Sequence, residues 1–435
     1  MARRIAGKST TLLGATALAC VLSLAASAEE LVIWHDKGDD GIRMIQQMSE
    51  IYAKTNPGVT IKSLSFPTEQ WFSKVIAALN TNTAPDIIFN DDSRIVRIQQ
   101  TTGKLEEMTP QIEAMPAADR AFLTDADKTS GTLEGKLLMV PFQRTIAGWG
   151  VRKSWLDKVG ETFPVTWADT LRVAEKFQKS DPDGNGKNDT YGMAWQAGNA
   201  GSIFGGSINL LAFGTGADHA LIDDDAKIII TKPEVAKPTV EFLKLFTEYK
   251  LVAPDTVNHT FTDMYQLIEG GRAGMFRVGN WNVGKWDKET ITGDYLVGAF
   301  PQFITNDKGS MVIGSVRGMA VPTNSPHKDA AKKFVAALVD KDIQQRSLEN
   351  MGGVVRTDLD TAKVTPSLKP FVDPNTKLAS TDFMTAKFPW YPALQETYYK
   401  KLIGAISSPP ADWDAWLKQT ADELQAEVEK LKAKG

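Results

Sequence analysis

The first side chains suited to chemistry lie close to the N-terminus. Trp34, His35, Asp36 and Lys37 place an aromatic ring, an imidazole, a carboxylate and an ammonium group at four successive positions. Such a set can stack on the apolar face of a ring and exchange hydrogen bonds with the hydroxyl groups of a small molecule. These four residues are therefore candidates for one wall of a ligand site, and a solvated turn is the alternative.

A second group of oxygen-bearing side chains lies at residues 181–189, with the sequence Asp-Pro-Asp-Gly-Asn-Gly-Lys-Asn-Asp. Positions 1, 3, 5, 7 and 9 of an EF-hand calcium loop would fall on Asp181, Asp183, Asn185, Lys187 (through its carbonyl) and Asp189. Position 12 is Gly192, so the usual bidentate glutamate is missing. The spacing favours a structural calcium ion, and a turn rich in Asp and Asn without metal is the alternative. No cofactor is expected to be required.

Three strand–loop–helix units would position the N-terminal residues. Short apolar strands are predicted at residues 31–34, 59–64 and 87–89, and each is followed by a polar loop and a helical pattern. Thr68 is expected to cap the second helix, and Asp92 or Ser93 the third. This order predicts a doubly wound α/β arrangement, in which the carboxyl ends of the strands open into the ligand-binding crevice.

The later part of the chain continues the α/β pattern. Two strands that cross between two parts of the molecule are predicted, at residues 135–142, which include Pro141, and at residues 314–322. Helices are predicted at 166–177, 237–249, 261–269 and 327–339, and a strand followed by a polar, aromatic turn at 272–281. The last helix carries an apolar stripe that is expected to pack on the protein itself: Trp413, Trp416, Leu417, Leu424, Val428 and Leu431.

The first 28 residues have the pattern of a secretory signal peptide. Arg3, Arg4 and Lys8 precede an apolar stretch, and Ala26-Ser27-Ala28 is a small-residue cleavage signal. Cys20 is the only cysteine, and it lies inside the apolar stretch, so we expect it to be removed rather than lipidated. The mature chain is then expected to be exported and to have no disulfide.

Length and charge limit the function further. Residues 29–435 are too many for one ordinary core and suit two lobes. Because the three basic residues of the leader are lost, the net charge falls from −4 to −7. This charge argues against nucleic acid as a partner.

Several motifs, taken in order, resemble the periplasmic solute-binding proteins of ABC importers. The resemblance covers the mature chain and is to extracellular solute-binding protein family 1, the carbohydrate-binding family that includes maltodextrin-binding protein. It rests on Leu31-Val32-Ile33-Trp34 with Asp36-Lys37-Gly38, Pro85-Asp86-Ile87-Ile88-Phe89 with Asp91-Asp92, Val140-Pro141-Phe142, Gly279-Asn280-Trp281, Met319-Ala320-Val321-Pro322 and Pro389-Trp390-Tyr391. The calcium-type loop is also similar to one found in members of the family.

The resemblance implies two doubly wound lobes joined by a hinge of crossing strands, which is the type II periplasmic binding protein fold. We expect residues 29–141 and 314–356 in the N-terminal lobe, and 142–313 and 357–435 in the C-terminal lobe. The hinge is expected near 141–144, 312–318 and 353–358. The family further implies a periplasmic monomer that closes on a sugar and presents it to ABC permease subunits.

Candidate ligand contacts are aromatic residues and planar polar side chains at strand ends, because sugar rings stack and hydroxyls need hydrogen-bond partners. They are Trp34, His35, Asp36, Lys37, Trp71, Asp91, Asp92, Arg144, Trp195, Asn280, Trp281, Arg317, Arg356, Trp390 and Tyr391. For each Trp, core packing is the alternative. Trp155 and Trp167 begin helices and are assigned to packing.

Four arginines depart from what a neutral-sugar site needs. Arg144, Arg277, Arg317 and Arg356 lie at crossings or strand ends, and guanidinium is a preferred partner of carboxylate and phosphate. One hypothesis is therefore an anionic saccharide or a polyol derivative. The alternative is that these arginines bind carboxylates of the protein or neutral hydroxyls.

Two other function classes stay open at this stage. A secreted glycan-cleaving enzyme would need two carboxylates a fixed distance apart on the cleft walls, whereas Asp36 and Asp91 or Asp92 come from neighbouring strand ends of one lobe. A binding protein for a non-sugar solute, such as a phosphoester or polyamine, is the other alternative. The expectation is a binding protein and not an enzyme.

Overall fold

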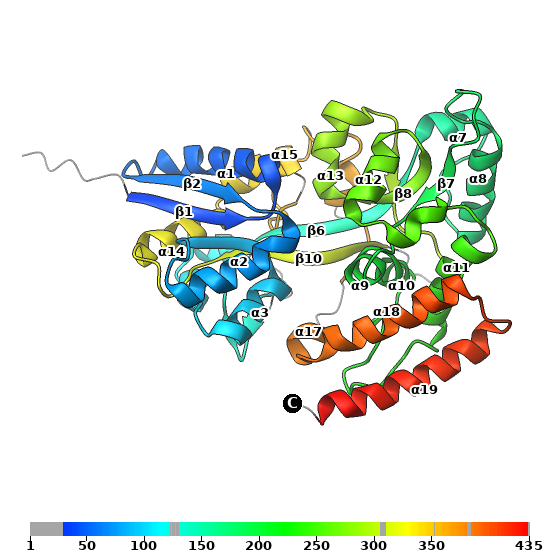
Figure 1. Ribbon diagram of the computed structural model, residues 1–435. Coiled ribbons are helices and arrows are strands. Elements are labelled where there is room, and N and C mark those ends of the chain that lie inside the picture. The colour runs from blue at the N-terminus through cyan, green and yellow to red at the C-terminus, as the bar shows by residue number, and fades with distance from the viewer. Residues whose placement is uncertain are drawn as a thin grey trace, which may run out of the picture.

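The computed structural model describes residues 29–121, 123, 127, 130–304, 310–351, 353–373, 375–380 and 384–433, and the predicted signal peptide lies outside them. Figure 1 shows two lobes that are linked by two long strands, β6 and β10, and by a few neighbouring segments. No helix of the described residues is both long and apolar enough to cross a membrane.

Helices and strands alternate along most of the chain. The first lobe in Figure 1 holds β1 (Glu29–His35), α1 (Gly38–Ala53), β2 (Val59–Ser65), α2 (Thr68–Thr81), β3 (Ile87–Asp91), α3 (Asp92–Thr102), α4 (Thr109–Glu113), α5 (Ala117–Arg120), β4 (Thr132–Leu133), β5 (Lys136–Leu137), α14 (Lys328–Ala336), η4 (Ala337–Val339) and α15 (Lys341–Met351). The crossing strands are β6 (Val140–Val151) and β10 (Met311–Ala320).

The second lobe holds α7 (Lys153–Val159), α8 (Trp167–Lys179), β7 (Tyr191–Ala194), α9 (Ala200–Ile203), η1 (Phe204–Ile208), α10 (Asn209–Gly214), α11 (Pro233–Thr247), η2 (Pro254–Asn258), α12 (Phe261–Glu269), β8 (Ala273–Gly279), α13 (Asn280–Lys285), η3 (Trp286–Thr290), β9 (Leu296–Gly298), α16 (Lys369–Val372), β11 (Leu378–Ser380), α17 (Met384–Lys387), α18 (Tyr391–Ser407) and α19 (Trp413–Lys432).

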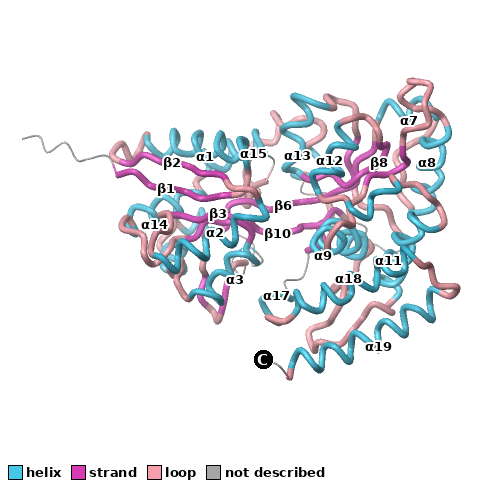
Figure 2. Tube along the Cα trace, viewed as in Figure 1, coloured by secondary structure: helices cyan, strands magenta, loops and turns pink. Residues whose placement is uncertain are grey.

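One sheet runs through both lobes, as the strands in Figure 2 show. Its order is β2-β1-β3-β10-β6-β8-β7, with β9 and β11 attached to β6 and β10. The outer strands are parallel within each lobe, β2-β1-β3 in one and β7-β8 in the other. β10 is antiparallel to β3 and to β6, and β6 is antiparallel to β8. The parallel strands of the two lobes therefore point towards each other.

Each lobe has an apolar core on both faces of its part of the sheet. Ile87 and Phe89 of β3 contribute to the core beneath α1 and α14, while Ile88 between them contributes to the core beneath α2 and α3. In the second lobe, Met275 and Phe276 of β8 likewise enter two different cores. Strands that are covered on both faces read as continuous apolar runs, which is why these segments could be predicted.

Most local predictions are confirmed, whereas two helix caps and one turn are wrong, and the strand predicted at 135–142 is divided between β5 and β6. The three strands of the first lobe, helix α12 and the packing stripe of α19 are confirmed, and Trp155 and Trp167 are buried in the core as expected. The predicted N-caps of α2 and α3 are wrong, because the N-cap residues are Pro67 and Asp91. Neither residue makes a side-chain hydrogen bond that caps its helix. The turn predicted after β8 is helical and forms α13. The lobe boundaries stay predictions, and α15 contacts both α1 and α13.

Candidate ligand-binding site

The candidate site lies where the carboxyl ends of the two parallel strand sets face each other. Asp91, the last residue of β3, is level with Arg317 of β10, which is level with Gln143 of β6. Gly279, the last residue of β8, is level with Ala147 of β6. The two edges are therefore four residues of β6 apart, roughly 13 Å at about 3.3 Å per residue.

The first lobe contributes a cluster of charged side chains at this edge, which we call the N-lobe charge cluster: Asp36, Lys37, Asp91, Arg94 and Arg317. Arg317 donates through Nη1 to Asp36 Oδ1 at 3.1 Å and through Nη2 to Asp91 Oδ2 at 3.2 Å. Arg94 Nη1 donates to the other oxygen of Asp36 at 2.9 Å. Sequence reasoning missed Arg94, whose position on a predicted helix gave no sign that it reaches the strand end.

Burial and charge compete over protonation in the N-lobe charge cluster. Burial alone would raise the pKa of Asp36 and Asp91, but the positive charges nearby, Arg317 foremost, hold both pKa values below their usual range. Burial, and then repulsion from Arg317, lowers the pKa of Lys37 to about 8. Because both carboxylates accept bonds from arginine, much of their hydrogen-bonding capacity is used inside the protein.

Two further residues expected to contact ligand support the loops instead. His35 is fully buried, and burial lowers its pKa to about 4, so the ring is neutral at pH 7 and its Nδ1 accepts a bond from the Lys37 backbone N–H at 3.1 Å. Asp92 is also buried, and it accepts hydrogen bonds from the Ser130 hydroxyl and from the Ser93 backbone. Burial raises the pKa of Asp92 to about 7. Neither side chain is accessible in this conformation.

The second lobe contributes an arginine surrounded by rings, which we call the aromatic cluster: Arg277, Phe261, Tyr265 and Trp281. The guanidinium carbon lies 4.6 Å from the ring centre of Phe261, 5.2 Å from Trp281 and 5.9 Å from Tyr265. The Tyr265 oxygen accepts bonds from Arg277 Nη2 at 2.6 Å and from Trp281 Nε1 at 3.1 Å. The half-buried Trp281 ring lies over Gly279, where a Cβ would come within 2.4 Å of the indole.

Local sequence explains the shape of the aromatic cluster but did not reveal it. A capping box between Thr260 and Asp263 starts α12, and the four-residue spacing of Phe261 and Tyr265 places both rings on one face. Their spacing was visible in the sequence, whereas their contact with a strand residue depends on how α12 packs.

Several predicted contacts are placed in the core, which corrects the expectation for them. Trp71 is buried between the sheet and helices α2 and α3. Trp195 is buried and stacked on Trp149, with ring centres 5.3 Å apart. Tyr391 is also buried. Trp390 is half-buried and stacked on Phe388, so its ligand role stays a prediction. Trp34 stays half-buried, with an edge contact to Phe66.

Three polar residues of the prediction hold the chain together, which corrects a ligand role for them. Arg144 pairs with Asp127 and donates to the Val355 carbonyl at 3.1 Å. Arg356 pairs with Asp358 and Asp119. The side-chain amide of Asn280 makes two hydrogen bonds to the backbone of β6: Nδ2 donates to the Arg144 carbonyl, and Oδ1 accepts from the Ile146 N–H.

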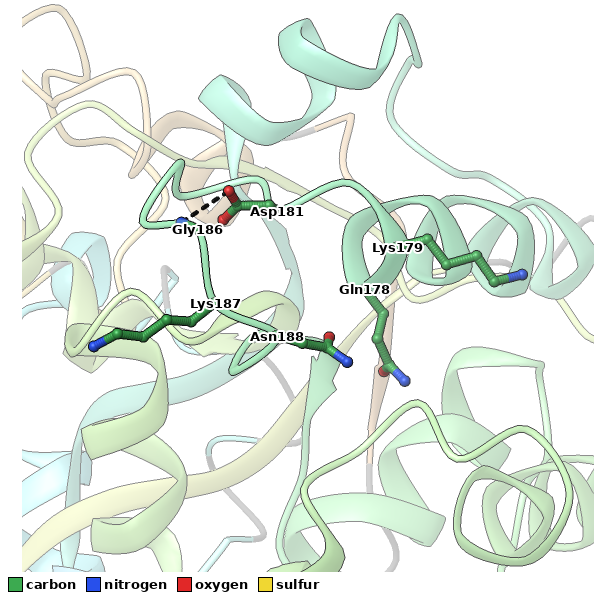
Figure 3. Close-up of a pocket in the computed structure, with 6 residues that line it drawn as sticks. All are labelled: Gln178, Lys179, Asp181, Gly186, Lys187 and Asn188. Carbon is green, nitrogen blue, oxygen red and sulfur yellow. Dashed lines mark hydrogen bonds between the residues drawn. The ribbon is translucent and has the colours of Figure 1, made fainter.

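The calcium-type loop lies away from this region and lines a cavity of about 440 Å³ with Gln178 and Lys179 (Figure 3). Both carboxylate oxygens of Asp181 accept loop N–H groups, from Asn185 and Gly186. The Asn185 amide nitrogen donates to the carboxylates of Asp183 and Asp189 at 2.7 and 3.1 Å. The Asp181 turn suits an EF-hand-like loop. However, the described residues contain no group of three or more acidic, His or Cys side chains arranged for a metal.

Comparison with known proteins identifies the kind of molecule. The family described as bacterial extracellular solute-binding protein matches residues 36–345. A lactose-binding protein of Rhizobium radiobacter is 23% identical over 352 residues, which cover 78% of each chain. The fructooligosaccharide ABC transporter substrate-binding protein FusA of Streptococcus pneumoniae is 26% identical over 195 residues, but these cover 45% of this chain and only 34% of FusA.

Solved structures share the fold. The substrate-binding protein Lmo0181 of Listeria monocytogenes, in complex with cycloalternan, superposes with a TM-score of 0.72 at 16% identity. The match covers 92% of this chain and 99% of Lmo0181. At this identity the similarity establishes the fold, and the α/β architecture with two lobes is the one that the sequence predicts.

Proposed function

The chain belongs to the bacterial extracellular solute-binding protein family, and from this we propose that it captures a sugar or oligosaccharide between its two lobes and delivers it to an ABC permease. The observation that carries the proposal is the strand topology. The carboxyl ends of β1 and β3 face that of β8 across four residues of β6, which is where ligands bind in open α/β sheets.

The names of the relatives support a saccharide as the ligand. The lactose-binding protein, FusA and a polygalacturonan/rhamnogalacturonan-binding protein of Bacillus subtilis all carry sugar ligands in their names. The family comprises binding proteins and not enzymes. For this chain we propose the periplasm as the location and a monomer as the working form.

Accessible groups on each side would bind the sugar. Trp34 and Trp281 are half-buried rings suited to stacking. Lys37 supplies an ammonium group, and the Asp91 side chain stays 21% exposed beside Arg317. Hydroxyl groups of a sugar can share these donors and acceptors while its ring lies on an indole face.

Closure would bend the crossing strands where their pairing is already interrupted. The register of β10 against β6 shifts between Ile313 and Ser315 and again between Arg317 and Gly318. Between these shifts the Thr145 and Ser315 hydroxyls bond each other at 2.8 Å, and Ser315 also donates to Asp91 at 2.8 Å. A bulged ladder bends more readily than a regular one, so the two lobes can close on a ligand at this point.

A calorimetric screen tests the proposal. The mature protein is titrated with neutral mono- and oligosaccharides, with sugar acids and with a polyamine and a phosphoester as non-sugar controls. We expect at least one saccharide to bind and to be recovered unchanged. Binding of a control solute alone, or cleavage of the saccharide, would contradict the proposal.

A further inference from the structure

Three of the four arginines that suggested an anionic ligand have carboxylate partners within the protein. Arg144 pairs with Asp127, Arg317 with Asp36 and Asp91, and Arg356 with Asp119 and Asp358. For these three, the simpler explanation holds: they neutralise carboxylates of the chain. They therefore carry no argument about the charge of the ligand.

Arg277 differs from the other three. Its residue is only 3% exposed, yet among the described residues no carboxylate forms an ion pair with it. Its Nη2 donates to Tyr265, and its buried Nε has no hydrogen-bond partner in the described part of the chain. A guanidinium stays charged at all physiological pH values, and burying it without a counter-charge is costly.

The surroundings of Arg277 leave a hydrogen-bond donor for a ligand. The Tyr265 oxygen accepts from both Arg277 and Trp281, so its own O–H can point to a third group. The rings of Phe261, Tyr265 and Trp281 stabilise the cation by cation–π contact, but they accept only weakly and leave Nε unsatisfied. The unpartnered Nε–H of Arg277 and the hydroxyl donor of Tyr265 therefore lie together near the carboxyl end of β8.

We propose that Arg277, with Tyr265 and Trp281, binds the carboxylate of a sugar acid. This inference rests on the proposed function and specifies the substrate class of the same site. A carboxylate is favoured over a phosphate ester because it carries a single negative charge, which one arginine balances, whereas a phosphate ester carries up to two. The indole of Trp281 would lie against the sugar ring that bears the acid.

The test compares acids with neutral sugars of the same shape. Digalacturonate is paired with its dimethyl ester, D-galacturonate with D-galactose, and D-glucuronate with D-glucose, and all are titrated by calorimetry together with neutral oligosaccharides. We expect at least one acid to bind tenfold or more tightly than its neutral counterpart. In Arg277→Gln this acid should bind on the order of 30-fold or more weakly, because the carboxylate then lacks its counter-charge.

Matched variants separate a ligand role from a structural one. Arg272→Gln removes an exposed arginine that immediately precedes β8 and lies over the Tyr191 ring. This variant should keep the preference for the acid. Arg277→Lys should recover part of the affinity, since a point charge without the planar fork remains. Without ligand, Arg277→Gln should unfold at or above the wild-type midpoint, because an uncompensated buried charge is removed.

The outcomes distinguish this inference from the proposed function. If neutral sugars bind as tightly as the acids, or if Arg277→Gln weakens both equally, Arg277 is structural and only this inference fails. If no saccharide of either kind binds, the proposed function fails with it. If Arg277→Gln does not fold, Arg277→Lys decides, and a preference for the acid that is unchanged from the wild type in that variant would overturn the inference.

Discussion

Replacing Arg317 by Met is the sharpest test of how the N-lobe charge cluster is held. The Arg317 side chain is 8% exposed and donates to Asp36, which is 2% exposed, and to Asp91. Removing one partner of a buried ion pair costs about 3–5 kcal/mol, since the charge left behind is uncompensated. Asp36 keeps the bond from Arg94, and Asp91 keeps the bond from Ser315. We therefore expect the lower value, about 3 kcal/mol.

The assay is urea unfolding of the ligand-free protein at several pH values. In the wild type the pKa of Asp36 is held below its ordinary value of 3.8, chiefly by Arg317 against the effect of burial. Its contribution to stability is therefore present above about pH 3.8 and is lost as the pH falls further. In Arg317→Met burial would raise this pKa. The difference between variant and wild type should thus be largest at pH 7 and should shrink towards pH 4.

An exposed ion pair provides the control. The side chains of Lys153 and Asp157 are 51% and 64% exposed, so Lys153→Met should cost no more than about 1 kcal/mol. Adding Asp36→Asn to Arg317→Met should recover at least about 1 kcal/mol, because the two sites are coupled. A loss for Arg317→Met as small as that for Lys153→Met, and independent of pH, would refute the reasoning.

Three further predictions concern separate parts of the molecule. Burial raises the pKa of Asp92 to about 7, so this residue increasingly destabilises the folded protein as the pH rises from about 4 to 7. Asp92→Asn should remove this pH dependence and stabilise the protein at pH 8 by at most about 4 kcal/mol. Denaturant unfolding that shows no gain in stability at pH 8 would contradict this prediction. The loop that begins at Asp181 is predicted to bind structural calcium. The melting temperature should therefore be higher in calcium than in EGTA for the wild type, but not for Asp181→Asn. Equal melting temperatures of the wild type in calcium and in EGTA would show that the loop is a turn without metal. Trp281→Ala should weaken the best saccharide on the order of 30-fold, whereas Trp413→Ala on α19 should leave the affinity unchanged in calorimetry, and equal losses would argue against stacking on Trp281.

The prediction of individual ligand contacts from sequence failed where a residue type has two common uses. Trp71 and Trp195 are as large and apolar as Trp34 and Trp281, and nothing in their immediate neighbours separates a core ring from a surface ring. The distinction depends on which helices cover the sheet at that point. The same holds for arginine. Asp127, the ion-pair partner of Arg144, lies on a different segment, and the local sequence around Arg144 gives no sign of this pairing.

The sequence by itself determined the elements and their order. Several patterns can be recognised from residues a few positions apart: the apolar run at 87–89, the spacing of Phe261 and Tyr265, the polar residues at strand ends and the calcium-type spacing at 181–189. Only the tertiary structure decided that Arg317 is neutralised by carboxylates and that Arg277 is surrounded by rings. The physical reason is that periodicity is a property of the local chain. The pairing of a buried charge depends on segments that folding brings together from far apart, as with Arg317 and Asp36, 281 residues away in the sequence.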